Sequence, residues 1–275
     1  MLNQFFIEEH VKKALEEDIG FGDITTDYLT DEEDIMSCTL NSRTDGIFCG
    51  KNVFKTVFKI LSDKIEIKFY KKDGDKILKG EKIADIKGSA RYILMGERTA
   101  LNYIQRMSGI ATETHKYQEA IGEYKAKVVD TRKTTPLFRA FEKYSVKIGG
   151  GSLHRFNLSD CAMIKDNHIR YAGSITKAVE KLRKNISHAH KIEVECDTKE
   201  QVIEALKSEV DIIMLDNMPV TLMKECVELI NGKAIVEASG NVNLNTIKEI
   251  ASTGVNIISS SAIVAKAPTL DLGLD

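Results

Sequence analysis

Cationic side chains gather in two short stretches near the middle of the chain. The segment DTRKTTPLFR carries Arg132, Lys133 and Arg139, and the segment KIGGGSLHR ends in His154 and Arg155. Arginine binds carboxylates and phosphates through two parallel N–H donors, and glycines let a backbone approach a ligand closely. The two stretches predict a site for a substrate with several negative charges. The alternative is solvated surface charge paired with nearby acids.

Charged side chains follow later apolar runs: first a lysine, which belongs with the cationic stretches, and then two acids. AMIK ends at Lys165, IEVE at Glu195 and IIMLD at Asp216. Two carboxylates at neighbouring strand ends suit Mg²⁺, a hard cation that keeps several waters and bridges substrate phosphates. A structural hydrogen bond or a general base is the alternative role. Glu193 lies two residues before Glu195 on the same strand, so both side chains point to the same face of the sheet. Glu193 is therefore an alternative to Glu195 for this role.

Small hydroxyl and glycine residues follow the last two apolar runs. IVEAS is followed by glycine, and IIS opens a run of three serines. In β/α barrels this region often binds phosphate through backbone N–H groups and a helix N-terminus. The candidates for such a phosphate pocket are Ser239, Gly240, Ser259, Ser260 and Ser261.

The elements that carry these residues alternate between short apolar runs and segments with helical spacing, from about residue 110 onward. This alternation predicts parallel strands joined by crossover helices. A barrel and an open doubly wound sheet both fit it, although no G-x-G-x-x-G follows a first strand. In a barrel the active site lies at the carboxyl ends of the strands, where the polar residues above would converge.

The first part of the chain has a mixed character. FFIEEHVKKALEEDI, KNVFKTVFKILS and ARYILMGERTALNYIQRMSG have helical spacing, whereas IMSCTLNSR, KIEIKFY and EKIADIKG read as strands. We therefore expect an α+β domain with an antiparallel sheet over residues 1–109, to which 267–275 could return, and a catalytic α/β domain over 110–266.

Composition limits the classes of function. The net charge is -2, which argues against a general nucleic-acid binder, so any anion site must be a local cluster. The five cysteines form no C-x-x-C pair, which favours reduced thiols in a cytoplasmic protein. The amino-terminal segment lacks a basic region followed by an apolar run, and no run approaches the length of a membrane span.

Several long motifs resemble one family. LEEDIGFGDITT, GERTALNYIQRMSGIAT, DTRKTTP, EKYSVKIGGGSLHRFNLSDCAMIKDNH, IEVEC, IIMLDN and EASGNV resemble the quinolinate phosphoribosyltransferases. The resemblance implies an open α/β sandwich followed by an incomplete, TIM-like α/β barrel. It implies transfer of phosphoribosyl from phosphoribosyl pyrophosphate to quinolinate with decarboxylation, in de novo NAD synthesis. It also implies Mg²⁺ and a homo-oligomer, at least a dimer, whose active sites are shared between subunits.

The resemblance also implies roles for single residues. Arg132, His154 and Arg155 match the residues that grip quinolinate, and Arg98 matches an arginine that reaches into the partner's site. Lys133 and Lys165 match lysines near the carboxylates and the sugar phosphate. The candidate catalytic residues are Lys133, Lys165, Glu195 and Asp216, of which the two acids would meet Mg²⁺ and the ribose hydroxyls. Ser239 and Gly240 match part of the 5′-phosphate pocket, and Arg139 is a further candidate for substrate binding.

Three positions depart from the family's usual pattern. Leu137 and Asn241 stand where the family usually has glycine, and Ser260, Ser261 and Ala262 replace a VGA run. The rival hypotheses are a related phosphoribosyltransferase for another aromatic acid and a phosphate-sensing barrel without turnover. A metal-binding or nucleic-acid module has less support, since the sequence shows neither a group of residues at metal-ligand spacing nor a basic stripe.

Overall fold

The computed structural model describes residues 2–31 and 33–275, which fold into two compact units. The first unit comprises the chain up to His115 together with Pro136–Gly150 and Ala267–Asp275, and the second comprises Lys116–Thr135 and Gly151–Lys266. The expected boundary at residue 109 therefore falls inside one helix. Residues 136–150, expected in the second domain, pack in the first unit because Phe141 is buried in that unit's core.

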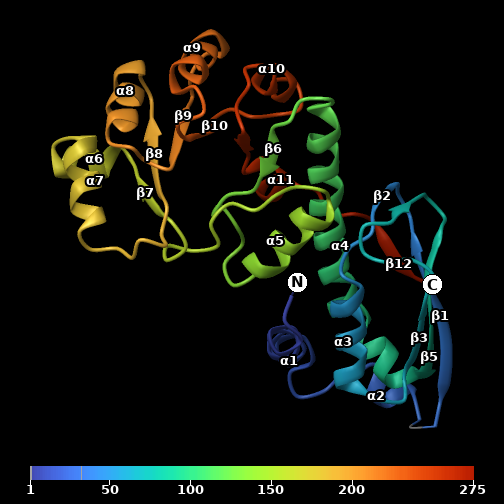
Figure 1. Ribbon diagram of the computed structural model, residues 1–275. Helices are drawn as coiled ribbons and strands as arrows, with labels where there is room; N and C mark the ends of the chain where they lie inside the picture. The colour runs from blue at the N-terminus through green and yellow to red at the C-terminus, as the bar shows by residue number, and fades with distance from the viewer. Residues whose placement is uncertain (1, 32) are drawn as a thin grey trace. The chain divides into compact units, whose positions relative to one another are not determined.

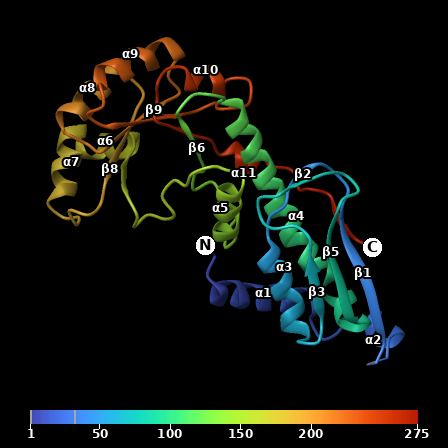
Figure 2. The ribbon, with the colours of Figure 1, turned by 45° about the vertical axis from the view of Figure 1, so that its right-hand side comes forward.

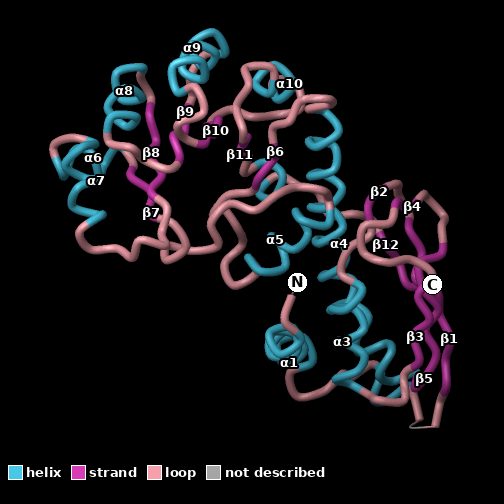
Figure 3. The backbone as a smooth tube through the Cα atoms, in the orientation of Figure 1, coloured by secondary structure: helices cyan, strands magenta, loops and turns pink. Residues whose placement is uncertain are grey.

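An antiparallel sheet with the strand order β12-β1-β5-β3 forms one layer of the first unit (Figure 3). Its strands are β1 (Ile35–Ser42), β3 (Glu66–Phe69), β5 (Lys82–Ser89) and β12 (Leu272–Leu274), and β2 (Gly46–Ile47) pairs with β4 (Lys76–Ile77) beside them. Burial alternates along β1, with Cys38 and Leu40 facing the core. The expected return of 267–275 to this domain occurs through the pairing of β12 with β1.

The first unit also contains helices, some of which lie along one face of this sheet (Figures 1 and 2). They are α1 (Gln4–Ile19), α2 (Thr26–Leu29), α3 (Lys51–Leu61), the first part of α4 (Ala90–Ala120) and α5 (Arg139–Ile148). Side chains one turn apart, such as Val53 and Val57 of α3, are buried in the same core as Leu40. The sequence predicted an end to α4 near Gly109, but the helix continues to Ala120. The glycine allows a close contact instead, since a Cβ there would overlap the carbonyl of Pro268.

The second unit is a parallel sheet with the strand order β6-β11-β10-β9-β8-β7. Its strands are β6 (Lys127–Val129), β7 (Ala162–Ile164), β8 (Ile192–Cys196), β9 (Ile212–Asp216), β10 (Ile235–Ser239) and β11 (Ile257–Ser259). Its helices, besides the end of α4, are α6 (Asp166–Ala172), α7 (Ile175–Arg183), α8 (Lys199–Lys207), α9 (Val220–Ile230), α10 (Ile247–Ala251) and α11 (Ala262–Ala265). Helices α7, α8 and α9 run along the outside of the strands (Figures 1 and 2).

The strands of the second unit are buried on both faces, which explains their nearly continuous apolar sequence. Ile213 and Leu215 of β9 face one way and Met214 the other, and all three are buried. The first two strands of this unit along the chain, β6 and β7, lie at opposite edges of the sheet. This order fits an α/β barrel that is incomplete between those two strands. The fold class expected from the sequence, a mixed sheet domain followed by a parallel α/β unit, is confirmed.

No helix in residues 2–31 and 33–275 combines the length and the apolar character needed to cross a membrane.

Candidate active site

A cavity of about 730 Å³ opens at the carboxyl ends of the parallel strands of the second unit. It collects nearly all of the residues singled out from the sequence: Arg132, Lys133, His154, Arg155, Lys165, Glu195, Asp216, Ser239, Gly240, Ser259, Ser260 and Ser261. Because parallel strands run in one direction, their carboxyl ends meet at one edge and bring these distant residues together.

A second hollow of about 980 Å³ lies at the opposite, amino-terminal ends of the same strands. It is lined by residues such as Lys127, Asp211 and Asn256, which precede or begin strands. The smaller cavity is the stronger candidate, since the carboxyl ends of barrel strands carry the chemistry and the amino ends mainly contribute stability.

The cationic side of the cavity begins directly after β6. The loop that carries Arg132 and Lys133 is folded on itself: the amide of Lys133 donates to the hydroxyl of Thr131 at 3.0 Å, and Thr134 Oγ1 donates to the carbonyl of Arg132 at 3.4 Å. These local bonds stabilise a turn. Arg132 and Lys133 are exposed at its surface, where an anion could reach them.

Arg155 is held in place by the chain around β7. Its Nη1 donates to the carbonyl of Cys161 at 2.9 Å, and its Nη2 lies 3.4 Å from Sδ of Met163. The preceding residue is anchored as well, since the amide of His154 donates to Oδ1 of the buried Asp130 at 2.8 Å. The segment before β7 is therefore fixed on both sides of the His154–Arg155 pair.

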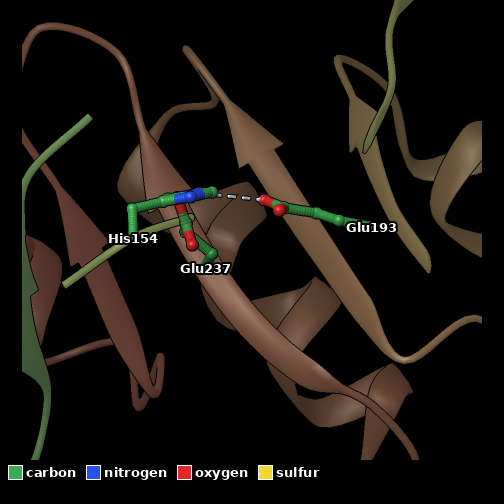
Figure 4. Close-up of side chains that lie close together, drawn as sticks. All are labelled: His154, Glu193 and Glu237. Atoms are coloured by element: carbon green, nitrogen blue, oxygen red, sulfur yellow. Dashed lines mark ion pairs between the residues drawn. The ribbon is translucent and has the colours of Figure 1, made fainter. Parts of the chain in front are cut away.

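Two buried glutamates face the ring of His154 (Figure 4). Nε2 of His154 lies 3.3 Å from Glu237 Oε1 and 3.5 Å from Glu193 Oε1. Glu193 is 0% and Glu237 2% exposed, and both oxygens of Glu193 and Oε1 of Glu237 have no hydrogen-bond partner within bonding geometry. Buried carboxylates without such partners are costly, so a role for this group is expected.

Opposing effects set the charge of the His154 ring. Burial disfavours the charged form, but the two carboxylates outweigh burial and raise the pKa of His154 to about 10. Burial has the largest effect on Glu193 and raises its pKa; the hydrogen bond of His154 lowers that pKa, the charge of Glu237 raises it, and the net shift is upward. In the other direction, the amide of Arg155 donates to Nδ1 of His154 at 2.7 Å, a contact that favours the neutral ring with its proton on Nε2.

His154, Glu193 and Glu237 also form a set of donor atoms within 4.8 Å of one another, which a divalent cation could share. Coordination through Nε2 normally leaves the proton on Nδ1, where it donates to a neighbour. Here Nδ1 accepts a bond from the Arg155 amide instead. The arrangement therefore favours a proton between the imidazole and the carboxylates over a metal ion.

The acidic side of the cavity lies at the ends of β8 and β9. Glu195 Oε2 accepts a hydrogen bond from Lys165 Nζ at 2.5 Å, and Asp216 Oδ2 accepts one from Asn217 Nδ2 at 2.7 Å. Each acid thus keeps its other oxygen for a ligand. Carboxylates on neighbouring strands, partly exposed in a cavity with room for water, form a donor set of the kind that Mg²⁺ takes.

The serines after β11 differ in what they offer a ligand. The hydroxyl of Ser259 donates to the carbonyl of Ala238 at 3.5 Å, and that of Ser260 donates to the carbonyl of Val242 at 3.3 Å. Both serines are buried. Their hydroxyls bind the last loops together, which leaves Ser261 and the backbone of Gly240 as the more accessible members of the predicted phosphate pocket.

Two predicted residues lie outside this cavity. Arg98 is an exposed residue of α4, and Arg139 begins α5; both belong to the first unit. Their roles stay predictions.

Sequence reasoning missed other residues that line the cavity or lie beneath it. Asn217 and Lys266 line it, and Glu237 faces His154. A signal for Glu237 was present, because it precedes Ser239 by two residues on a strand and so shares its facing. Lys266 had no signal, since it follows a short helix and not a strand.

Comparison with known proteins identifies the relatives of the chain. Residues 110–275 match the family model "Quinolinate phosphoribosyl transferase, C-terminal domain", and residues 23–108 match the corresponding N-terminal domain. The chain is 40% identical to a probable nicotinate-nucleotide pyrophosphorylase [carboxylating] of Bacillus subtilis, covering 100% of this chain and 92% of the relative. It is 39% identical to quinolinate phosphoribosyltransferase [decarboxylating] 2b, mitochondrial, of Nicotiana tabacum, covering 98% of this chain and 81% of the relative.

A solved structure supports the same relation. The crystal structure of NadC from Streptococcus pyogenes superposes with a TM-score of 0.97 at 39% identity, covering 100% of this chain and 97% of that chain.

Proposed function

The chain belongs to the quinolinate phosphoribosyltransferase family, and from this premise we propose how its cavity carries out the family's reaction. The protein transfers phosphoribosyl from phosphoribosyl pyrophosphate to quinolinate and releases CO₂, giving nicotinate mononucleotide and pyrophosphate. This is a step of de novo NAD synthesis.

The observation that carries the proposal is the division of the cavity into a cationic and an acidic side. Arg132, Lys133 and Arg155 stand on one side, and Glu195 and Asp216 at the ends of β8 and β9 form the other. Quinolinate is a dianion, and guanidinium groups match its planar carboxylates. The two reactants of this reaction would thus find separate, complementary sides of one cavity.

The side chains orient the reactants. Arg132 and Arg155 hold the ring carboxylates so that the ring nitrogen faces the anomeric carbon of the phosphoribosyl donor. The new N–C bond forms as the bond to pyrophosphate breaks, and holding both reactants in place supplies a large effective concentration. The carboxylate beside the ring nitrogen then leaves as CO₂. The electron pair of the broken C–C bond stays on that ring carbon, where the adjacent positive nitrogen stabilises it, and a proton from solvent takes the place of the carboxylate. Lys133 is a nearby cation that could assist this loss.

Glu195 and Asp216 would hold a Mg²⁺ ion together with the donor's oxygens. When bound, Mg²⁺ offsets the negative charge of the departing pyrophosphate. Lys165, paired with Glu195 at 2.5 Å, orients that carboxylate and adds a positive charge near the donor. The accessible Ser261 and Gly240 would receive the 5′-phosphate.

The finer predictions about assembly and location are part of this proposal. A homodimer, at the least, would bring Arg98 of one protomer to the cavity of its partner. A cytoplasmic location suits the substrates. Five free thiols support it, since cytosolic proteins keep cysteines reduced.

The test is product formation from quinolinate and phosphoribosyl pyrophosphate, with and without Mg²⁺. Nicotinate mononucleotide and CO₂ in equal amounts, formed only with Mg²⁺, are the expected result. Turnover with nicotinate or another aromatic acid, but not with quinolinate, would favour a related phosphoribosyltransferase. Binding without any product would favour a phosphate-sensing protein.

A further inference from the structure

Two asparagines in an unusual backbone conformation lie beside each other at the mouth of the cavity. Asn217 follows β9 and has a φ of 53°, and Asn241 follows Gly240 after β10 and has a φ of 50°. Both residues line the cavity. Left-handed backbone costs most side chains free energy, and asparagine is among the few that tolerate it.

Their side chains form a hydrogen-bonded chain that ends on an acid of the site. Asn241 Nδ2 donates to Asn217 Oδ1 at 3.2 Å, and Asn217 Nδ2 donates to Asp216 Oδ2 at 2.7 Å. The ionised carboxylate can only accept, so it requires the NH₂ of Asn217. The oxygen of Asn217 must then face Asn241, which in turn must present its own NH₂. The direction of both bonds is therefore set by Asp216.

The surrounding backbone fixes both asparagines. The amide of Asn217 donates to the carbonyl of Ser239 at 2.9 Å, and the carbonyl of Asn241 accepts from Asn243 Nδ2 at 3.1 Å. A Cβ at Gly240 would overlap the side chain of Asn217, so only glycine leaves room for this packing. The ends of β9 and β10 are thereby joined through side chains as well as through the sheet.

We propose that Asn241 is a positioning residue that, acting through Asn217, holds the carboxylate of Asp216 in one orientation toward the phosphoribosyl donor. With Oδ2 engaged by Asn217, Oδ1 of Asp216 is the oxygen presented to the ribose or to its metal ion. A glycine at position 241 would adopt the same backbone but offer no donor. The inference rests on the proposed function only in naming the phosphoribosyl donor as the ligand of Asp216.

The test compares Asn241→Gly and Asn241→Asp with the same two changes at Asn231. Asn231 is a matched control because it also has a positive φ, 44°, but caps the end of α9 and does not line the cavity. Asn241→Gly removes one neutral hydrogen bond, so the KM for phosphoribosyl pyrophosphate should rise about 3- to 10-fold while the KM for quinolinate is unchanged. Its Tm should not fall, because glycine relieves the left-handed backbone.

Asn241→Asp should have the larger effect. An aspartate cannot donate to Asn217, and it would turn the Asn217 amide so that its oxygen faces Asp216. We expect the KM for phosphoribosyl pyrophosphate to rise more than 10-fold, with the Asn231 variants at the wild-type value. A wild-type KM for this substrate in both Asn241 variants would overturn the proposal. Equal rises for both substrates together with a lower Tm would also overturn it.

A binding measurement separates this proposal from the proposed reaction. Calorimetry with inorganic pyrophosphate and Mg²⁺ needs no turnover. Weaker binding to Asn241→Asp than to the wild type and to Asn231→Asp would support the role of Asn241 even if quinolinate were not the substrate. Equal binding to all three proteins, or no binding to the wild type, would overturn it.

Discussion

Nε2 of His154 lies 3.3 Å from Glu237 Oε1 at one side of the cavity that holds the cationic and acidic residues of the site. A second buried carboxylate, that of Glu193, lies 3.5 Å from the same nitrogen. One imidazole thus faces two acids, and three of their four carboxylate oxygens have no hydrogen-bond partner within bonding geometry. A stable core does not require such a group, so we attribute it to the orientation of His154 in the candidate cavity.

Glu193→Gln should stabilise the fold. Burial and Glu237 outweigh the opposing effect of His154 and raise the pKa of Glu193, so its charged form opposes folding at neutral pH, and a neutral amide removes that opposition. We expect the free energy of unfolding in urea to increase by about 1–3 kcal/mol. Activity should fall, because His154 loses one of its two partners. A destabilised variant would show that the carboxylate is a favourable partner of His154.

The protonation of His154 provides a pH test. Its pKa in the folded protein is raised from 6.5 to about 10 by Glu193 and Glu237, despite burial. Stability contributed by its protonation is fully present below pH 6.5 and is lost as the pH rises toward 10. NMR titration of labelled histidines should find this pKa well above 6.5, and Glu237→Gln should lower it. A His154 pKa at or below 6.5 in the wild type would mean that the hydrogen bond from the Arg155 amide to Nδ1 outweighs the effect of the two carboxylates.

Arg132→Ala should weaken quinolinate binding selectively. Loss of charge-assisted hydrogen bonds to a carboxylate should lower kcat/KM for quinolinate about 10- to 100-fold, while the KM for phosphoribosyl pyrophosphate changes little. Steady-state kinetics with each substrate varied in turn provides the measurement. Arg132→Lys keeps the charge but not the two-pronged donor, so partial activity is expected. Equal loss of affinity for both substrates would indicate a disturbed fold.

Removal of divalent cations should abolish turnover, and Mg²⁺ should restore it. The donors that we assign to the ion are Glu195 and Asp216, of which Glu195 also binds Lys165. Asp216→Asn removes one anionic donor, and the Mg²⁺ concentration at half-maximal activity should rise about 10-fold. Full activity of the chelator-treated enzyme would contradict the assignment.

Leu137→Gly should raise the stability of the protein. Leu137 has a φ of 63° and an 88% exposed side chain, so it bears the strain of left-handed backbone and buries little apolar surface in return. Relief of that strain exceeds the entropic cost of glycine by about 0.5–1 kcal/mol. Thermal unfolding should show a small rise in Tm. A lower Tm would show that the leucine side chain contributes packing that its exposure does not reveal.

The sequence by itself determined the elements and most of the residues that line the candidate cavity. Apolar runs alternating with helical segments predicted a parallel α/β unit. Each strand of such a sheet must bury both faces, so its sequence is apolar whether the sheet is open or closed into a barrel. Polar residues at the ends of these runs, from Arg132 to Ser261, were found because parallel strands bring their carboxyl ends to one edge. The long motifs added the family, which the comparisons confirm.

Only the tertiary structure decided which of these side chains are free for a ligand. Ser259 and Ser260 read like Ser261 in the sequence, but their hydroxyls bind backbone carbonyls of other strands and loops. Glu237 and Asn241 gained roles from contacts with His154 and Asn217, which lie far away along the chain. Such contacts depend on the register between strands. The alternation of side chains along a strand shows which face of the sheet a residue points to, but it does not show which residue lies beside it on the next strand.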